Sequence, residues 1–258
     1  MLSHPLYKLG AVHNPPPETI RTLSERASLH LMNVPKSADW FKACPADGNS
    51  LGNDHAGNCV QVARYRTIQA RLANTQGFIW ALDQSLPIAM YARETGYDLA
   101  TGKPDNGTNT NDDMVDWCKN GTRIDDQLED VPLWVIVNPF DDNHLALAIG
   151  HCGPIQVTFN LPLEAQDLTT WSKPPGRGTG WWPGTWGEHR GITGAFDGSV
   201  RMVRTWGQDI AIHPEWWSKY VLGVDVTLSR STWFDATGLA PAGLDWGALR
   251  ADLDSLKG

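Results

Sequence analysis

A cysteine and a histidine separated by 189 − 59 = 130 positions are the residues of this chain best suited to catalysis. Cys59 follows a loop-forming string, Leu-Gly-Asn-Asp-His-Ala-Gly-Asn, and apolar residues then recur mostly every three or four positions until Asn74. This pattern predicts that Cys59 begins a helix, where unpaired N–H groups and the helix dipole favour a thiolate. His189 lies in a strand-like stretch downstream, and an imidazole there could act as the base for the thiol.

The loop before Cys59 holds further candidates. Asn53 could direct a side-chain amide at an oxyanion, and Gly57 would let the backbone approach a substrate carbonyl closely. Asn58 immediately precedes the helix and is a candidate for the substrate cleft. Each feature also has a plainer interpretation, because an Asn/Asp/Gly string forms turns by composition alone and a lone histidine in a strand is usually structural. Spacing alone leaves both interpretations open.

Several short motifs resemble those of papain-like proteins found in bacteriophages and prophages. The segment before Cys59 matches the pattern LGND-x-x-G-[DN]-C, and the agreement in order and spacing continues to the end of the chain. The other matching segments are Gly96–Asp98, Asp105–Thr108, His189 with Gly194–Asp197, Val203–Gly207 and Gly238–Leu256. The resemblance implies that Cys59 is the nucleophile and His189 its base, with Asn53 and the Cys59 N–H forming an oxyanion hole.

Two positions depart from the papain-like pattern. The residue that usually orients the histidine is an Asn two positions before a Trp-Gly pair, and here Arg204 holds that place, with Thr205 beside it. An arginine cannot accept a hydrogen bond from imidazole, and its charge would lower the pKa of the histidine. The usual oxyanion-hole Gln is shortened to Asn53. The resemblance further implies that Trp206 shields the edge of the histidine.

Local patterns predict the elements that position these residues. Helices are expected over 59–74, 78–95 with a break at Pro87, 110–119, 142–150 and 213–220, and strands over 155–159, 187–196, 199–206 and 221–228. The Asp197-Gly198 pair marks a hairpin turn. The sequence therefore predicts an α+β, papain-like, two-lobed fold. An extended arm covers 1–50, a helical lobe about 51–152, and an antiparallel β lobe about 153–258, with a cleft between the lobes.

A tryptophan-rich loop, residues 165–187, precedes His189. Its tryptophans could form an aromatic wall for a peptide or glycan, or simply hold a long loop together. Both interpretations stay open at this point. Trp186 and Trp206 are candidates for the cleft.

Composition excludes several classes of protein. The formal net charge of −8 disfavours nucleic acid and anionic membranes, and no apolar run approaches the roughly 20 residues of a membrane span. The four cysteines lack the C-x-x-C spacing of zinc sites, so we expect no metal, no cofactor and no disulfide at Cys59. The N-terminal residues do not resemble a signal peptide, which favours the host cytoplasm or a phage virion as the location.

Three functions are compatible with these observations. The first is a thiol hydrolase that cleaves amide bonds through an acyl-enzyme at Cys59, acting on a peptide or protein substrate. The second is a catalytically decayed virion structural or host-interaction protein that keeps the fold and binds phage virion proteins. The third is a peptidoglycan amidase. An active site requires the His189 ring to lie within about 5 Å of the Cys59 sulfur.

Overall fold

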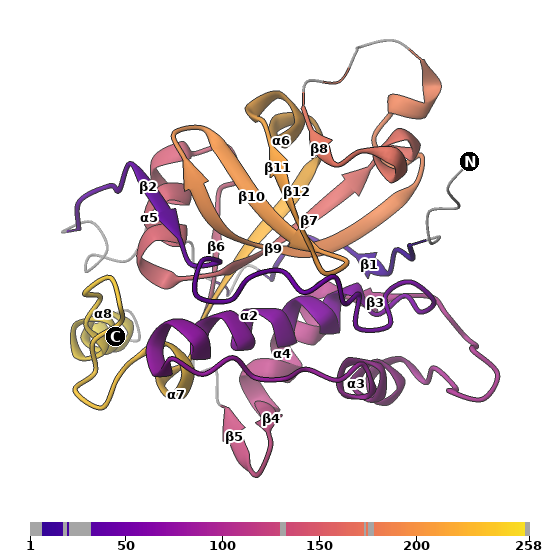
Figure 1. Cartoon of the computed structure of the whole chain (residues 1–258). Helices are drawn as coiled ribbons and strands as arrows, with labels where there is room; N and C mark the ends of the chain where they lie inside the picture. Colours follow the sequence, from indigo (N-terminus) through magenta and orange to yellow (C-terminus); the bar gives the residue numbers. More distant parts are fainter. Residues whose placement is uncertain are drawn as a thin grey trace.

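Helices gather beneath a twisted sheet, and an N-terminal segment passes between the two layers (Figure 1). The computed structural model describes residues 7–17, 20, 32–129, 133–172, 174 and 178–255. Part of the predicted N-terminal arm, and Leu256 at the end of the last matching motif, lie outside these residues. The mixed α+β architecture predicted from the sequence, with helices in one lobe and a mostly antiparallel sheet in the other, is confirmed.

Four predicted helices begin at the predicted residue or within one residue of it. The helices are α2 (Cys59–Gln76), α3 (Ser85–Thr95), α4 (Thr110–Asn120), α5 (Asp142–Cys152), α6 (Pro214–Tyr220), α7 (Arg230–Trp233) and α8 (Trp246–Ser255), with 3-10 turns η2 (Leu163–Asp167) and η3 (Thr179–Trp181). The starts of α2, α4, α5 and, within one residue, α6 agree with the prediction, and α4 and α5 have a side-chain N-cap. The helix predicted from Phe78 begins later, at Ser85, so that Pro87 lies in its first turn, where a missing N–H costs nothing.

One eight-stranded sheet forms the β lobe. Its order is β6 (Leu133–Val137), β12 (Val221–Leu228), β7 (Ile155–Leu161), β9 (Gly187–Asp197), β10 (Val200–Thr205), β11 (Gln208–Ile212) and β8 (Thr170–Trp171), with β2 (Ser37–Asp39) also paired to β9. Its neighbours are antiparallel except β11 and β8. Two small pairs complete the described strands, β1 (Ala11–Val12) with β3 (Thr108–Asn109) and β4 (Thr122–Ile124) with β5 (Gln127–Glu129).

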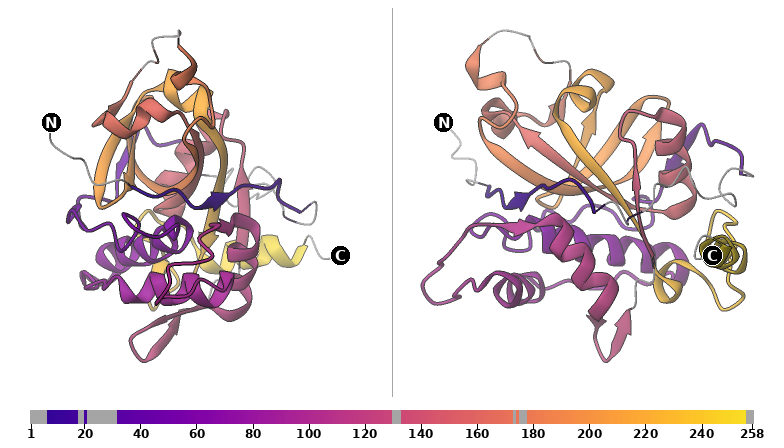
Figure 2. Two further views of the ribbon diagram at one scale, coloured as in Figure 1. Left: turned by 90° about the vertical axis from the view of Figure 1, so that its right-hand side faces the viewer. Right: turned by 180° about the vertical axis from the view of Figure 1, so that it is seen from behind.

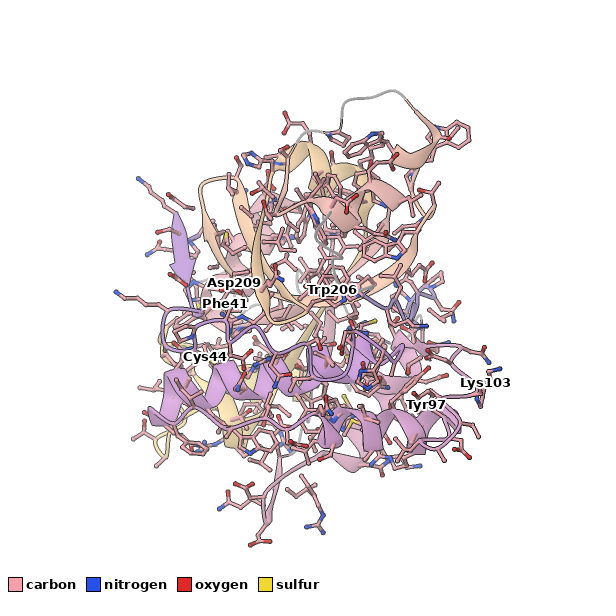
Figure 3. All side chains as sticks on the ribbon, turned by 45° about the vertical axis from the view of Figure 1, so that its right-hand side comes forward. Phe41, Cys44, Tyr97, Lys103, Trp206 and Asp209 are labelled. Carbon is pink, nitrogen blue, oxygen red and sulfur yellow. The ribbon has the colours of Figure 1, made fainter. Side chains whose placement is uncertain are left out.

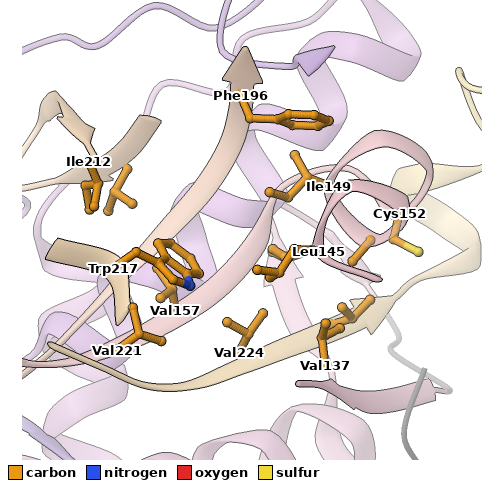
Figure 4. Packing of buried hydrophobic residues seen from close by; sticks show 14 of the residues in the cluster. Val137, Leu145, Ile149, Cys152, Val157, Phe196, Ile212, Trp217, Val221 and Val224 are labelled. Atoms are coloured by element: carbon orange, nitrogen blue, oxygen red, sulfur yellow. The ribbon is translucent and has the colours of Figure 1, made fainter. Parts of the chain in front are cut away.

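The core of the β lobe lies between the sheet and α5. Leu145 and Ile149 of α5 pack against Val157 of β7 and Val224 of β12, together with Val137 of β6 (Figure 4). Helix α5 and strand β6 therefore share one core with the later strands, although both precede residue 153. Periodicity identifies α5 as a helix but carries no information on which layer it covers.

Helix α2 runs beneath the sheet and above the other helices of its lobe (Figure 1). Of its 18 residues, 15 are buried, including Gln61, Arg64 and Arg71. A helix buried on every side must find partners for its polar side chains inside the protein.

In the described part of the chain, no helix is long and apolar enough to cross a membrane.

We predict that Asp141→Ala lowers the free energy of unfolding by about 1 kcal/mol, because its carboxylate caps α5. The Asp141 side chain accepts hydrogen bonds from the N–H groups of Asn143 and His144, at 3.1 and 3.0 Å. Urea unfolding measures the loss. Asp141→Asn, which keeps an acceptor oxygen, should lose less than half as much, and equal losses would show that the cap is not the cause.

Candidate active site

Cys59 is the first residue of α2, as the sequence predicted, and its side chain is 1% exposed. The loop before it is held by its own polar groups. Asn58, at the N-cap, donates its amide to the Leu51 carbonyl at 3.1 Å and does not cap the helix with its side chain. The backbone N–H groups of the first turn therefore remain available to a negative charge near the sulfur.

Asn53 reaches the same place as Cys59. Its side chain is buried, and its Nδ2 donates to the Ala56 carbonyl at 2.9 Å. Asn53 and Cys59 line one small cavity, with Thr205 and Trp206 on the opposite wall. A side-chain amide carries two N–H groups, so Asn53 keeps a second donor beyond the bond to Ala56. Gly57 donates its N–H to Asp105 at 2.8 Å, which fixes the loop beside Cys59.

His189 lies in β9 and is fully buried. The Trp206 ring stacks on its imidazole, with centroids 4.1 Å apart and planes at 19°. Nε2 hydrogen-bonds the Thr205 hydroxyl, whereas Nδ1 has no hydrogen-bond partner among the described residues. Burial lowers the pKa of His189 to about 3, so the imidazole is neutral at pH 7 in this form. Nδ1 is thus the ring nitrogen left for a proton-transfer role.

Thr205 is the residue that contacts the histidine, and Arg204 turns away. The Arg204 guanidinium forms a paired contact with Asp209, at 2.7 and 2.8 Å, and donates to the Cys44 carbonyl. It also lies over the Phe41 ring. Figure 3 labels Phe41, Cys44 and Asp209, the three residues that Arg204 contacts, close together at its left. Successive residues of a strand point to opposite faces, so only one of this pair can face His189. The expectation that the Arg204 charge lowers the His189 pKa is wrong; burial does so.

Trp206 is held above His189 by a tight turn. Trp206 and Gly207 link β10 to β11 with positive φ at both residues, 48° and 75°, as a two-residue primed hairpin turn requires. A Cβ on Gly207 would meet the Asn49 backbone nitrogen at 2.4 Å, so this position must be glycine. Trp186 stacks on the same indole, with ring centroids 5.4 Å apart.

The sequence predicts that the other tryptophans of the loop either line a ligand site or hold the loop together. Trp171 is fully buried against Trp216, and Trp181 packs on the same core. These two rings hold the loop to the lobe. Trp182 is 63% exposed and lies outside the Trp206 stack. An aromatic surface next to the cavity is therefore built from Trp186 and Trp206.

The N-terminal segment covers the site. We call residues 7–13 the strap, which runs between the lobes (Figure 2). Tyr7 stacks on Trp206 at 4.7 Å, and Ala11 packs on Cys59. The Gly10 carbonyl accepts the Thr108 N–H at 2.7 Å, within the parallel pairing of β1 and β3. The cavity left at Cys59 measures about 10 Å³, too small for a substrate residue.

Burial under the strap sets the protonation of the thiol. Burial raises the pKa of Cys59 to about 11, although the N–H groups of Arg190 and Gly10 point to the sulfur and partly offset it. The expected depression of this pKa by the helix start is therefore reversed in the covered form. Arg190 follows His189 in β9, which brings that strand directly against Cys59. The separation of about 5 Å between the sulfur and the imidazole stays a prediction.

The remaining cysteines take no part in the site. Cys44 and Cys152 are buried free thiols and Cys118 an exposed one, and Cys59 is also free. Among the described residues, no group of three or more His, Cys, Asp or Glu side chains is arranged to hold a metal ion.

We predict that Thr205→Val lowers the free energy of unfolding by about 1–3 kcal/mol, because it leaves a buried imidazole nitrogen without a partner. In ¹⁵N spectra of the histidines, His189 should change from one tautomer to a mixture. Thr205→Ser keeps the hydroxyl and should keep the wild-type spectrum. A Val variant with unchanged His189 signals would rule out the hydrogen bond.

We predict that Gly10→Ala displaces the strap and exposes Cys59. A Cβ at Gly10 would lie 1.8 Å from the Gly57 carbonyl oxygen, a distance that no packing tolerates. Alkylation of Cys59 by iodoacetamide at pH 8, located by mass spectrometry, should then be at least about tenfold faster, because release from the dry site restores the ordinary thiol pKa. Val12→Ala, in the same strand at a half-exposed side chain, is the control and should leave the rate unchanged.

Comparisons with known proteins identify the fold. No protein-family model matches the sequence, and no curated protein matches it either. Solved structures do match. Xylellain, a cysteine protease from Xylella fastidiosa, aligns with a TM-score of 0.64 at 16% identity, over 86% of this chain and 96% of its own.

Two further matches come from other organisms. Procathepsin B S9 from Trypanosoma congolense aligns with a TM-score of 0.57 at 10% identity, over 87% of this chain and 86% of its own. The Carica candamarcensis cysteine protease CMS1MS2, in complex with E-64, aligns with a TM-score of 0.55 at 12% identity, over 76% of this chain and 99% of its own. The chain therefore has the fold of the papain-like cysteine proteases.

Proposed function

We propose that the protein is a thiol peptidase with Cys59 as nucleophile and His189 as base. The observation that carries this proposal is the junction of α2 and β9. The sulfur of Cys59, at the helix start, lies against the backbone of Arg190, next to a histidine held by Thr205 and Trp206. The similarity of the fold to cysteine proteases supports the same assignment.

The residues divide the reaction between them. The Cys59 thiolate attacks the carbonyl carbon of the substrate, and its proton resides on His189. As the carbon–nitrogen bond breaks, His189 gives the proton to the departing amine. Water then attacks the thioester with His189 as base, and the Cys59 sulfur leaves. The Cys59 N–H and the second Asn53 amide N–H are the donors for the oxyanion.

Thr205 takes the orienting role that an Asn holds in the papain-like pattern. Thr205 bonds Nε2 of the imidazole. In the proposed mechanism its hydroxyl accepts the Nε2–H, which leaves Nδ1 free to exchange a proton with the thiol. A neutral hydroxyl stabilises an imidazolium less than a carboxylate does, so Thr205 acts mainly by fixing the ring. The shielding indole of Trp206 keeps water from this hydrogen bond.

The covered site describes a closed form of the enzyme. In this form the thiol is protonated and the cavity admits no substrate. Activity therefore requires that the strap leave the cleft. Displacement would return both Cys59 and His189 to water and to their ordinary pKa ranges.

A second candidate is a decayed relation of such enzymes that binds a partner and cleaves nothing. The complete burial of Cys59 and the replacement of the orienting Asn favour this candidate. The phage or prophage origin, the virion partners, the location in a host cytoplasm or virion, and a peptidoglycan substrate rest on the sequence resemblance and on composition, and they stay proposals.

We predict that Gly10→Ala hydrolyses fluorescein-labelled casein at least about tenfold faster than the wild-type chain. In this opened variant, Cys59→Ala should abolish hydrolysis, and His189→Ala should lower it at least about 100-fold, the usual contribution of a general base. Cys118→Ala removes an exposed thiol outside the site and should change nothing.

The same variants distinguish the enzyme from the decayed protein. If Cys59 of the Gly10→Ala variant reacts readily with iodoacetamide but no casein is cleaved, the second candidate is correct. If its alkylation at pH 6 persists after His189→Ala, the imidazole does not activate the thiol.

A further inference from the structure

A cavity of about 650 Å³ opens on the helical lobe and not at Cys59. Its walls come from the end of α3, the loop before β3, β3 itself and the first turns of α4. Gly107 and Thr108 belong to this wall, and the same two residues contact Gly10 of the strap. The cavity and the strap therefore contact the same strand, β3.

The cavity carries more negative than positive charge. Four carboxylates line it, namely Glu94, Asp112, Asp113 and Asp116. Two guanidinium groups form ion pairs with carboxylates of this set: the half-exposed Arg93 and the buried Arg64. The formal balance is 2 − 4 = −2.

One oxygen of the Asp113 carboxylate lacks a hydrogen-bond partner among the residues that the structure describes. The Asp113 side chain is 0% exposed, and its Oδ1 lies 3.3 Å from Arg64. Its Oδ2 has no hydrogen-bond partner among the described residues. A buried carboxylate oxygen without a donor is costly, so its presence beside an open cavity indicates a missing donor.

The pKa of the neighbouring Glu94 also indicates that positive charge is lacking here. It accepts a hydrogen bond from Gln61 at 2.6 Å and lies 3.7 Å from Arg64. Burial and the negative charge of Asp113 nevertheless raise its pKa to about 7. A cation in the cavity would favour the ionised form of both carboxyl groups.

Two kinds of cation are possible, and the geometry favours an organic one. In the part of the chain that the structure describes, no three acidic or metal-binding side chains converge on one point. Arg93 instead shows that an organic cation fits these carboxylates: its half-exposed guanidinium binds Glu94 at 3.0 Å and Asp116 at 2.8 Å. The carboxylates are thus spaced for a nitrogen cation with several N–H donors.

We propose that this cavity binds the ammonium or guanidinium group of a basic side chain in the peptide that replaces the strap. The assignment of the ligand to a substrate rests on the proposed function. A peptide paired with β3 runs along Gly107 and Thr108, so a lysine or arginine side chain can cross this strand into the cavity. The acidic cavity would thereby select substrates that carry a basic residue near the cleaved bond.

The test measures binding, which does not require the thiol. The ¹⁵N amide spectrum of the full chain is titrated with Nα-acetyl-lysine N-methylamide, and separately with the norleucine analogue, which has the same length but no charge. Resonances of Gly107, Thr108 and the Asn120 side chain should shift with the lysine compound only, at constant ionic strength. Glu94→Gln and Asp113→Asn should each weaken binding about tenfold or more, because each removes a charged acceptor.

Controls separate this site from the rest of the molecule. Asp126→Asn removes the same charge from the exposed turn between β4 and β5 and should leave binding unchanged. Glu94→Gln serves if Asp113→Asn fails to fold. Equal shifts with norleucine, or unchanged binding in the folded variants, would overturn the site. Equally tight binding of n-butylammonium would overturn the assignment to a peptide. Cys59→Ala should bind as the wild type does, so a failed peptidase assay and a failed cation site remain distinguishable.

Discussion

The burial of helix α2 is the constraint on which the rest of the structure depends. Because the helix is covered on almost every side, its polar side chains must reach partners in distant segments. Arg64 donates to the Gly121 carbonyl and the Thr122 hydroxyl, and Arg66 pairs with Asp47. Arg71 reaches across to carbonyls at the sheet, including that of Thr227. Each such bond to a charged group contributes about 1.5–3 kcal/mol, and the Arg71 bonds are those that tie α2 to the sheet.

The geometry of the candidate site depends on how α2 packs. Cys59 stands where α2 begins, so the docking of that helix on β9 decides where the thiol lies relative to His189. The remaining parts arrive from separate segments: the loop with Asn53, the β10–β11 turn with Trp206, and the strap. None of these segments could place its residue without the shared core beneath it. The chemistry therefore depends on long-range packing more than on any single motif.

The exclusion of water explains the protonation of Cys59 and His189 in the covered site. An ion pair between a thiolate and an imidazolium must lose its hydration when water is excluded, and the lost hydration exceeds the attraction unless further hydrogen bonds compensate. Under the strap, burial therefore keeps Cys59 as a thiol and His189 as a neutral ring. Admission of water and substrate would reverse both shifts. One segment thereby controls both access to the site and the ionisation of the residues within it.

The sequence by itself determined features that depend on neighbouring residues. The helix start at Cys59 follows from the change from a loop composition to an apolar period, and the start at Asp142 from the capping residue Asp141. The hairpin at Asp197-Gly198 follows from turn chemistry, which also acts over a few positions. Tertiary structure alone decided that Thr205, and not Arg204, faces the histidine, because that choice depends on which face of the sheet each side chain of β10 lies on. It also decided that the strap lies over the thiol. An extended segment such as residues 7–13 carries no helical or strand periodicity, so its position is set only by the surface it packs against.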